Sequence, residues 1–514
     1  MGVLTAGLGT ADRSRPALVD ERGAISWAEL DERVNRAVHA LRDAGLREGD
    51  VVVTMLGNQR EFFEVSLACL QSGLLMVPVN WHWVADELQY VLDDAGASAL
   101  VVDERWSTVA DGVATDAVRI DVRDSGDRTW DGLLAGAAAD EPDEQIRGGV
   151  MFYTSGTTGR PKGVRSTLGV VGGDPVMWQL IAGMAAVFDL PDEDPVFLLS
   201  GPAYHSAQWV FSVFSLLHSA TVVMQHKFDA ADLLRLVETH RVTNLHLVPT
   251  QFTRLLRLPA EVRAGADLSS IVAVHHGAAP CPARIKREMI DWLGPVVSEY
   301  YGGTEGGFIT MISADEWLER PGSVGRPLDV ITITVTDDDG NEVPAGVTGQ
   351  LWFQSALGSD FEYHNAPDKT EKAHRASGVG TLGDVGHLDE DGYLFLSDRK
   401  IDMIISGGVN IYPAEIEAVL CTDPAVDDAA VIGLADDEFG ESVHAVVEVT
   451  KSEAAPDDEI AERLQQLCRT HLAGYKCPRS LEVVAELPRS EAGKVLKREL
   501  RDARQGRPTA SSTS

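Results

Sequence analysis

Apolar positions along residues 17–150 alternate between short unbroken runs and helical stripes. Residues 27–41 place apolar side chains at every third or fourth position, and this spacing predicts an amphipathic helix. Residues 51–56 and 74–79 are short apolar runs that predict buried strands, and residues 62–72 between them predict a helix. Because strands and helices alternate, this region is predicted to form α/β layers on a largely parallel sheet.

The same rhythm returns between residues 170 and 320, which predicts a second α/β unit. Residues 231–240 have the periodicity of an amphipathic helix. Four apolar runs in this region predict strands: residues 195–200, 221–224, 244–248 and 271–275.

The pattern changes after Gly325. Residues 331–336 alternate with period two, an Asp- and Gly-rich turn follows, and residues 349–354 predict another strand, which together indicate a small antiparallel unit. From residue 401 a compact α+β segment is predicted. Its helices are expected at residues 414–420 and 457–471, and its strands at 429–433 and 442–449.

These patterns predict an α/β fold with three parts. A large N-terminal domain, residues 1–400, is expected to contain two α/β subdomains and a small β-barrel-like subdomain. A small α+β domain follows at residues 401–504. The tail, residues 505–514, is rich in Gly, Pro, Ser and Thr and is predicted to be disordered.

The composition of the chain argues against some classes of function. The 514 residues include 44 Lys and Arg against 79 Asp and Glu, a formal charge of −35 that argues against a broad nucleic-acid interface. A local cluster of cations and N–H groups can still hold a small anion. The five cysteines are scattered, as expected for structural thiols in a reducing compartment. With neither a signal peptide nor a run of ~18 apolar residues, the chain is predicted to be cytoplasmic, without stable membrane insertion.

Residues 153–164, Tyr-Thr-Ser-Gly-Thr-Thr-Gly-Arg-Pro-Lys-Gly-Val, form the first candidate site. Glycines let the backbone approach a polyphosphate, while hydroxyl and N–H groups donate to its oxygens and Lys162 adds a charge. The spacing is not that of a Walker A loop, because Pro161 stands where the second glycine is required. From this segment alone, a flexible linker is the alternative.

Residues 299–307, Glu-Tyr-Tyr-Gly-Gly-Thr-Glu-Gly-Gly, form the second. An aromatic side chain beside glycines offers a stacking face for a purine. Thr304 can donate to phosphate, and the carboxylate of Glu305 suits Mg²⁺. Taken singly, this segment and the upstream Gly-Ala-Ala-Pro at residues 277–280 would equally fit plain turns.

Two further segments carry candidate residues. Asp384 follows a predicted strand and can hold ribose hydroxyls, although a β-turn role explains it equally well. The glycine pair at residues 407–408 permits close backbone approach, and Pro413 fits the first turn of a helix. Lys494 directly follows a glycine on a predicted loop; alone, it would be interpreted as a solvated surface lysine.

Together, in this order, the four segments resemble the acyl- and aryl-CoA synthetases of the adenylate-forming superfamily, over residues 18–501. Residues 201–205, 299–301 and 403–408 look most like those of bacterial fatty-acid and steroid-acid CoA ligases. The resemblance implies ATP-dependent activation of a carboxylic acid as acyl-AMP and transfer of the acyl group to coenzyme A. It also implies Mg²⁺ as cofactor and a C-terminal domain that rotates between the two half-reactions.

The resemblance assigns roles to individual residues. It gives the catalytic residues as Lys494, which bridges the carboxylate and the α-phosphate, His205 at the mouth of the acid pocket, and the Mg²⁺ ligand Glu305. The implied ATP- and AMP-binding residues are Thr154, Ser155, Gly156, Thr157, Thr158, Lys162, Gly277, Ala278, Ala279, Pro280, Tyr301, Gly302, Thr304, Asp384 and Arg399.

The acid pocket and the acceptor tunnel complete the expected site. For the pocket residues, ordinary core packing is the alternative explanation. The candidates are Tyr204, Gln208, Trp209, His246, His275 and Gly303 for the pocket, and Gly407 and Gly408 for the tunnel.

The acceptor has alternatives, because every adenylation motif is shared among them. An amide synthetase would pass the acyl group to an amine, and a loading enzyme would pass it to a carrier protein. A regulatory protein without chemistry is disfavoured because Lys162, Glu305 and Lys494 are all present. The chain departs from the family pattern at Ile401, where relatives have a polar hinge residue, and at residues 378–384, which lack the usual Trp. A monomer or homodimer is expected.

Overall fold

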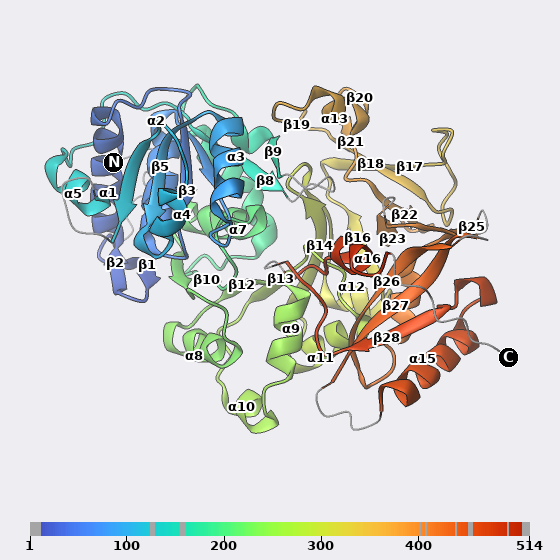
Figure 1. Cartoon of the computed structure of the whole chain (residues 1–514). Coiled ribbons are helices and arrows are strands. Elements are labelled where there is room, and N and C mark those ends of the chain that lie inside the picture. Colours follow the sequence, from blue (N-terminus) through green and yellow to red (C-terminus); the bar gives the residue numbers. More distant parts are fainter. Residues whose placement is uncertain are drawn as a thin grey trace.

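The computed structural model describes residues 12–123, 129–154, 161–399, 402–406, 409–436, 439–450, 456–490 and 493–505. Its elements form a large α/β body, a set of antiparallel strands, and a C-terminal α+β unit that lies against both (Figure 1). The predicted fold class is confirmed. The predicted disordered tail lies, but for Gln505, outside the described residues.

The first sheet is five-stranded and wholly parallel. Helix α1 (Trp27–Asp43) begins at Ser26, whose side chain accepts from the Glu29 N–H in a capping box. Helix α2 (Arg60–Ser72) ends at Gly73, which adopts the left-handed conformation that glycine permits. The strands, in spatial order, are β6 (Val118–Val122), β5 (Ala97–Asp103), β3 (Val51–Met55), β4 (Leu75–Pro78) and β7 (Gly149–Val150).

The second sheet contains fifteen of the described strands. Its parallel half has the spatial order β1 (Pro16–Asp20), β11 (Thr221–Met224), β10 (Val196–Leu199), β12 (Asn244–Leu247), β13 (Ala273–His276) and β14 (Val297–Gly303). Helices α7 (Ser206–Leu217), α8 (Ala230–His240), α9 (Pro249–Leu256) and α11 (Ala283–Leu293) connect and cover these strands. Strand β2 (Gly23–Ser26) pairs antiparallel with β1 at the edge of this sheet, so residues 16–26 belong to the second sheet, although the sequence pattern grouped residues 17–150 as one unit.

An antiparallel half continues the same sheet. Strands β15 (Gly307–Ile312) and β16 (Ser323–Pro327) lead from the parallel half into it. The remaining strands are β17 (Ile331–Thr336), β18 (Gly349–Ser355), β20 (His374–Ala376), β21 (Val379–Gly380), β22 (Asp384–Leu388) and β23 (Leu394–Arg399). The small antiparallel unit predicted after Gly325 is thus present, as an extension of the larger sheet.

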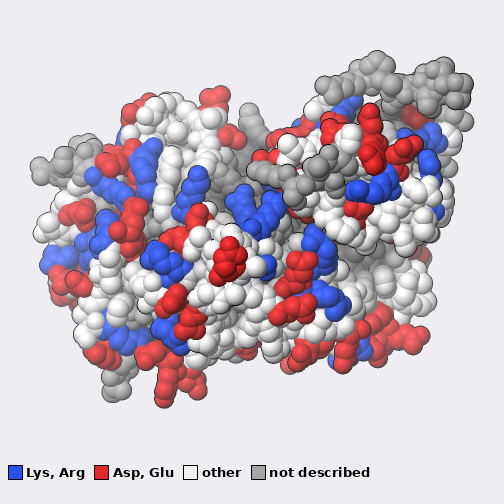
Figure 2. Space-filling model, turned by 90° about the horizontal axis from the view of Figure 1, so that it is seen from below, with Lys and Arg blue, Asp and Glu red and all other residues white. Residues whose placement is uncertain are grey.

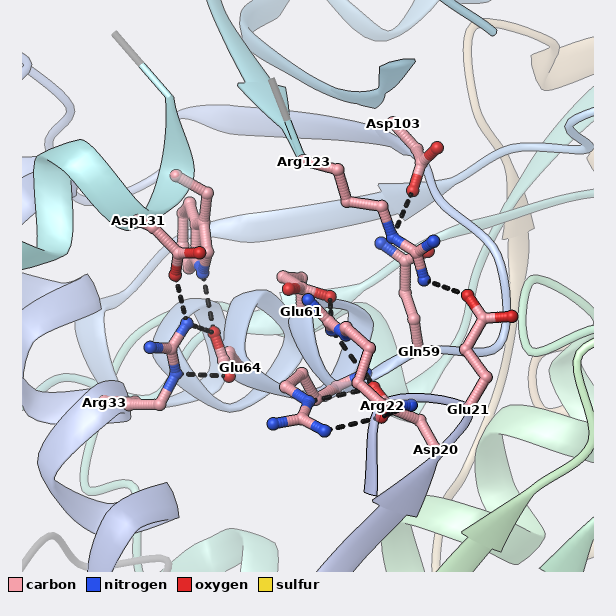
Figure 3. Close-up of polar contacts among 12 residues, drawn as sticks. Asp20, Glu21, Arg22, Arg33, Gln59, Glu61, Glu64, Asp103, Arg123 and Asp131 are labelled. Carbon is pink, nitrogen blue, oxygen red and sulfur yellow. Dashed lines mark hydrogen bonds and ion pairs between the residues drawn. The ribbon is translucent and has the colours of Figure 1, made fainter. Parts of the chain in front are cut away.

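Buried ion pairs connect the two sheets (Figure 3). Arg33 of α1 donates to Glu64 of α2 at 2.6 and 3.0 Å, and the indole of Trp130 donates to the same carboxylate at 2.7 Å. Burial raises the pKa of Glu64, while Arg33 acts in the opposite direction. Arg22, on the β1–β2 hairpin, reaches Glu61 of α2 at 2.6 Å. Since losing one partner of a buried pair exposes the other to an uncompensated desolvation cost, this network fixes the hairpin against α2.

The C-terminal unit has its own five-stranded sheet and core. Its elements are β24 (Ile404–Ser406), β25 (Val409–Ile411), α14 (Pro413–Leu420), β26 (Val426–Asp436), β27 (Gly440–Val449), α15 (Asp457–His471), β28 (Ser480–Val484) and α16 (Lys497–Asp502). Pro413 occupies the first turn of α14, as predicted. In Figure 1 this unit is orange to red and lies beside α9 and α11.

The surface charge and the cysteines can be described directly from the structure. On the face in Figure 2, acidic and basic side chains are interspersed. All five cysteines are free thiols. Among the described residues, no helix has both the length and the apolar content that crossing a membrane requires.

Candidate active site

The predicted site residues gather where the parallel strands of the second sheet end. Residues 200–206 follow β10, residues 248–250 follow β12, residues 277–280 follow β13, and Thr304 and Glu305 follow β14. Because parallel strands have their carboxyl ends at one edge, these loops meet there, which is the usual position of a ligand site in an open α/β sheet.

Lys162, Tyr363 and Glu305 form the charged centre of the site. Strand β9 (Lys162–Arg165) pairs with β8 (Phe152–Thr154) on one side and with β19 (Glu362–Tyr363) on the other. This pairing places the Lys162 ammonium 5.1 Å from the centre of the Tyr363 ring. The Tyr363 hydroxyl donates to Glu305 at 3.0 Å. One aromatic side chain therefore contacts both the predicted phosphate-binding lysine and the predicted metal ligand.

Electrostatics around Lys162 favour a bound polyanion. Burial lowers the pKa of Lys162, the nearby Lys369 lowers it further, and Glu305 acts in the opposite direction. Two ammonium groups beside one carboxylate leave an excess of positive charge, which a phosphate would neutralise. Thr154 pairs with Lys162 across the β8–β9 hairpin. Ser155, Gly156, Thr157 and Thr158, in the loop of this hairpin, lie outside the described residues.

A second group brings together residues that are far apart in the sequence. The Tyr301 hydroxyl donates to Asp384 at 2.7 Å, and Asp384 pairs with Arg399 across β22 and β23. Thr304 shares a 2.8 Å hydrogen bond with the hydroxyl of Ser206 at the start of α7. The structure thus joins the second and third sequence motifs at one place, with the ring of Tyr301 beside the carboxylate predicted to hold a ribose.

The backbone after β13 approaches β14 very closely. A Cβ atom on Gly277 would lie 2.7 Å from the Tyr300 carbonyl oxygen, so glycine is required there. Ala278 has a φ of +67°, a conformation that costs energy for a residue with a side chain. Ala279 and Pro280 continue this loop toward α11, and Gly302 is held against Gly307 of β15. Strain of this kind is typical of functional loops.

Three of the six predicted acid-pocket residues share one aromatic cluster. We define the aromatic cluster as Phe188, Gln208, Phe211, His246, His275, Tyr300 and Phe308. The Gln208 amide lies 2.9 Å from Nδ1 of His246, whose Nε2 lies 2.9 Å from the Tyr300 hydroxyl. Both histidine rings stack on Phe211, with centroids at 4.5 and 5.4 Å.

The other three lie outside the cluster. Tyr204 packs edge-on against Trp81 at 4.9 Å, and Trp209 packs against Phe152 and Trp178. A Cβ on Gly303 would meet Leu382 and the Glu305 carboxylate, so Gly303 faces the phosphate side. His205 occupies the N-cap position of α7 beside Tyr204, and burial lowers its pKa to about 4, which keeps the imidazole neutral.

The loop that carries Lys494 is docked at the same edge of the sheet. Arg489 and Val495 pair across a tight turn, and the Ser490 N–H donates to the Lys494 carbonyl. The turn contacts the N-terminal body at Thr250: a Cβ on Gly493 would lie 2.2 Å from its hydroxyl oxygen. Gly407, Gly408 and the side chain of Arg399 lie outside the described part.

Local sequence gave no signal for two site residues, Tyr363 and Thr250. Tyr363 reaches Glu305 only because β19 pairs with β9, some two hundred positions earlier. Thr250 lies in the first turn of a helix that directly follows a strand, an arrangement that many residues without a functional role share. Either residue could be found from sequence only by comparing an alignment of related sequences.

Comparison with known proteins agrees with this geometry. Residues 9–358 match the AMP-binding enzyme family, and residues 415–494 match the AMP-binding enzyme C-terminal domain. A feruloyl-CoA synthase from an Amycolatopsis species is 35% identical over 485 residues, which cover 93% of this chain and 94% of that protein. The amide bond synthetase McbA from Marinactinospora thermotolerans is 28% identical and superposes with a TM-score of 0.84 over 98% of each chain.

A third relative was solved in two states. MatB from Rhodopseudomonas palustris is 29% identical over 98% of this chain and 99% of its own. The present structure superposes on its ATP-bound form with a TM-score of 0.84 and on its apo form with 0.73. The present structure as a whole is thus more similar to the ATP-bound form than to the apo form.

Proposed function

Because the chain belongs to the AMP-binding enzyme family, we propose that it activates a carboxylic acid with ATP and then transfers the acyl group to coenzyme A. In the first step a carboxylate oxygen attacks the α-phosphorus of ATP, and the bond to pyrophosphate breaks. In the second, the thiol of coenzyme A loses its proton, its sulfur attacks the acyl carbon, and AMP leaves. The single observation that supports this best is the convergence of Lys162, Tyr363 and Glu305.

The residues at the site fit these steps by position and charge. Lys162, with the Thr154 loop, would hold the β- and γ-phosphates, and Thr304 would donate to phosphate. Asp384 and Arg399 would hold the ribose, with the adenine between Tyr301 and residues 277–280. Bringing a carboxylate to a polyphosphate needs positioning and charge neutralisation rather than a nucleophilic side chain.

Mg²⁺ fits the donor set in a particular way. Among the described residues no cluster of three or more His, Cys, Asp or Glu side chains could hold a metal alone. Glu305 provides one hard oxygen, and Mg²⁺ commonly takes its remaining ligands from phosphates and water. When bound, the ion would neutralise phosphate charge, and Tyr363 would orient the Glu305 carboxylate toward it.

Lys494 and the domain arrangement belong to the same proposal. The turn carrying Lys494 contacts Thr250 at the site edge, which supports delivery of this ammonium during adenylation. We place the boundary between the N-terminal domain (1–400) and the mobile C-terminal domain (401–504) at the residues after β23, with Ile401, which lies outside the described residues, as pivot. The second step requires Lys494 to leave, so the C-terminal domain must rotate.

The acceptor separates two candidate functions. Similarity to feruloyl-CoA synthase favours coenzyme A, whereas the fold similarity to McbA favours an amine. The test is pyrophosphate release from ATP with a panel of fatty, aromatic and polycyclic acids, followed by mass spectrometry of products formed with coenzyme A or with amines. Acyl-CoA supports the proposal. An amide formed in preference to acyl-CoA would support the second function, and no acid-dependent pyrophosphate would refute both.

A further inference from the structure

Local hydrogen bonds give the turn around Lys494 its shape. The Ser490 N–H donates to the Lys494 carbonyl at 2.8 Å, and the Lys494 N–H donates to the Ser490 hydroxyl at 3.2 Å. Gly493 has a φ of +78°, a left-handed conformation that glycine adopts most readily. These bonds join residues within 488–496 to one another, so they do not by themselves fix the direction of the turn relative to the rest of the C-terminal unit.

Arg489 connects this turn to the sheet of the C-terminal unit. Its guanidinium donates to Asp428 of β26 at 2.7 Å and to Glu448 of β27 at 3.1 Å. Another N–H of the same group donates to the carbonyl of Gly493, directly before Lys494, at 3.3 Å. One rigid, planar group therefore joins two strands of the sheet to the residue next to Lys494.

These contacts are shielded from water. The side chain of Arg489 is 16% exposed and that of Glu448 is 11% exposed. Burial alone lowers the pKa of Arg489, but Asp428 and Glu448 outweigh this effect, so its pKa is raised overall. Charge-assisted hydrogen bonds at a buried site hold their geometry better than exposed ion pairs, which are weakened by solvent.

Glu448 also faces the N-terminal body. Its Oε2 accepts from Arg489, whereas its Oε1 lies 3.8 Å from the guanidinium of Arg257, which directly follows α9. At the other end of α9, Thr250 leaves no room for a Cβ on Gly493. The turn is thus held from behind by Arg489 and fitted closely against α9 in front, which leaves it a narrow range of orientations.

We propose that Arg489 is a positioning residue for Lys494. Its contacts with Asp428, Glu448 and the Gly493 carbonyl set the direction in which Lys494 enters the active site, and it acts through Lys494 without touching a substrate. Adenylation depends on this direction, whereas acyl transfer takes place after Lys494 has left and does not. The inference rests on the proposed function and adds a residue to its first half-reaction.

Arg489→Lys tests the geometry while keeping a positive charge between the two carboxylates, so that the C-terminal unit still folds. A lysine ammonium is a point charge and cannot reproduce the planar set of donors that reaches both carboxylates and the Gly493 carbonyl. Acyl-AMP formation, measured in a single turnover without coenzyme A, should slow by about 10- to 100-fold. Transfer from supplied acyl-AMP to coenzyme A should be unchanged.

Asp428→Asn weakens the same contacts from the other side. It removes a charge that Arg489 binds, leaves Asp427 and Arg257 in place, and keeps an oxygen that can accept from the Ala429 N–H. We expect a smaller loss of the same kind, roughly 2- to 5-fold in acyl-AMP formation alone. An equal slowing of both half-reactions in this variant would contradict the proposal.

Arg504→Lys is the matched control. Arg504 belongs to the same unit, its side chain is 13% exposed, and it donates to the Glu482 carboxylate at 2.8 Å and to the Leu500 carbonyl at 3.0 Å, both outside residues 488–496. Wild-type adenylation in Arg489→Lys, equal losses in both of its half-reactions, or the same selective loss in Arg504→Lys would overturn the inference. A wild-type enzyme that releases no acid-dependent pyrophosphate would instead refute the proposed function.

Discussion

Replacing Arg257 with alanine should bias the enzyme against its first half-reaction. Arg257 follows the last turn of α9, and its guanidinium contacts Asp427 of β26 and lies 3.8 Å from Glu448 of β27. The Asp427 side chain is 8% exposed, and burial raises its pKa while Arg257 lowers it. Without Arg257, the docked arrangement leaves Asp427 buried next to Glu448, and rotating the C-terminal domain away relieves this.

The expected free-energy change lies between the values typical of a surface ion pair and of a fully buried one. Arg257 is 45% exposed, so its pair is partly screened like a surface ion pair, which contributes about 0.2–1 kcal/mol. Breaking a fully buried pair costs about 3–5 kcal/mol, and Asp427 approaches that limit. Arg489 still contacts Glu448 at 3.1 Å and removes part of the repulsion. We therefore expect about 1–2 kcal/mol against the docked arrangement, or roughly a 5- to 30-fold population shift.

Single-turnover rates of the two half-reactions measure this shift. Acyl-AMP formation without coenzyme A should slow relative to acyl transfer from supplied acyl-AMP, by up to the same 5- to 30-fold. Arg254→Ala is the control, since Arg254 lies on the same helix and packs on Phe228 of the N-terminal body. Equal losses in both half-reactions, or the same change in Arg254→Ala, would refute an interdomain role for Arg257.

Three other results are expected. Lys494→Ala should slow acyl-AMP formation by ~10²–10³ while sparing transfer from supplied acyl-AMP, and near wild-type adenylation would contradict the assigned role. Tyr363→Phe keeps the aromatic ring next to Lys162 but removes the hydrogen bond to Glu305. The affinity for MgATP, measured by calorimetry in the absence of the acid substrate, should fall several-fold. An unchanged affinity would show that Tyr363 contributes only packing. Burial lowers the pKa of His205 to about 4 and that of His246 to about 3 in the folded protein. Between pH ~6.5 and pH ~4 these histidines therefore take up protons in the unfolded chain but not in the folded one. The free energy of unfolding should then decrease as the pH falls through this range, by up to ~1.4 kcal/mol per pH unit for each histidine. A thermal midpoint constant from pH 7 to 5 would contradict this.

Sequence predicted the local elements well, because hydrophobic periodicity reports burial directly. Residues 221–224, 331–336 and 457–471 were predicted with the bounds that the structure gives to β11, β17 and α15. Periodicity carries no information about which strands pair. That is why the β1–β2 hairpin was grouped with the wrong sheet and why Tyr363 was missed, although Glu305 and Lys162 on either side of it were predicted.

Helix α9 connects the proposed adenylation chemistry to the proposed domain rotation. It has eight residues, so its two ends are about 10 Å apart. Thr250, in its first turn, contacts the turn that carries Lys494, and Arg257, directly after its last residue, contacts Asp427. Both contacts join the N-terminal body to the C-terminal unit, and neither can persist if that unit rotates. In the proposed cycle, the same helix would hold the turn that carries Lys494 during adenylation and would carry the ion pair that breaks before transfer, so we expect contacts on α9 to influence the balance between the two half-reactions.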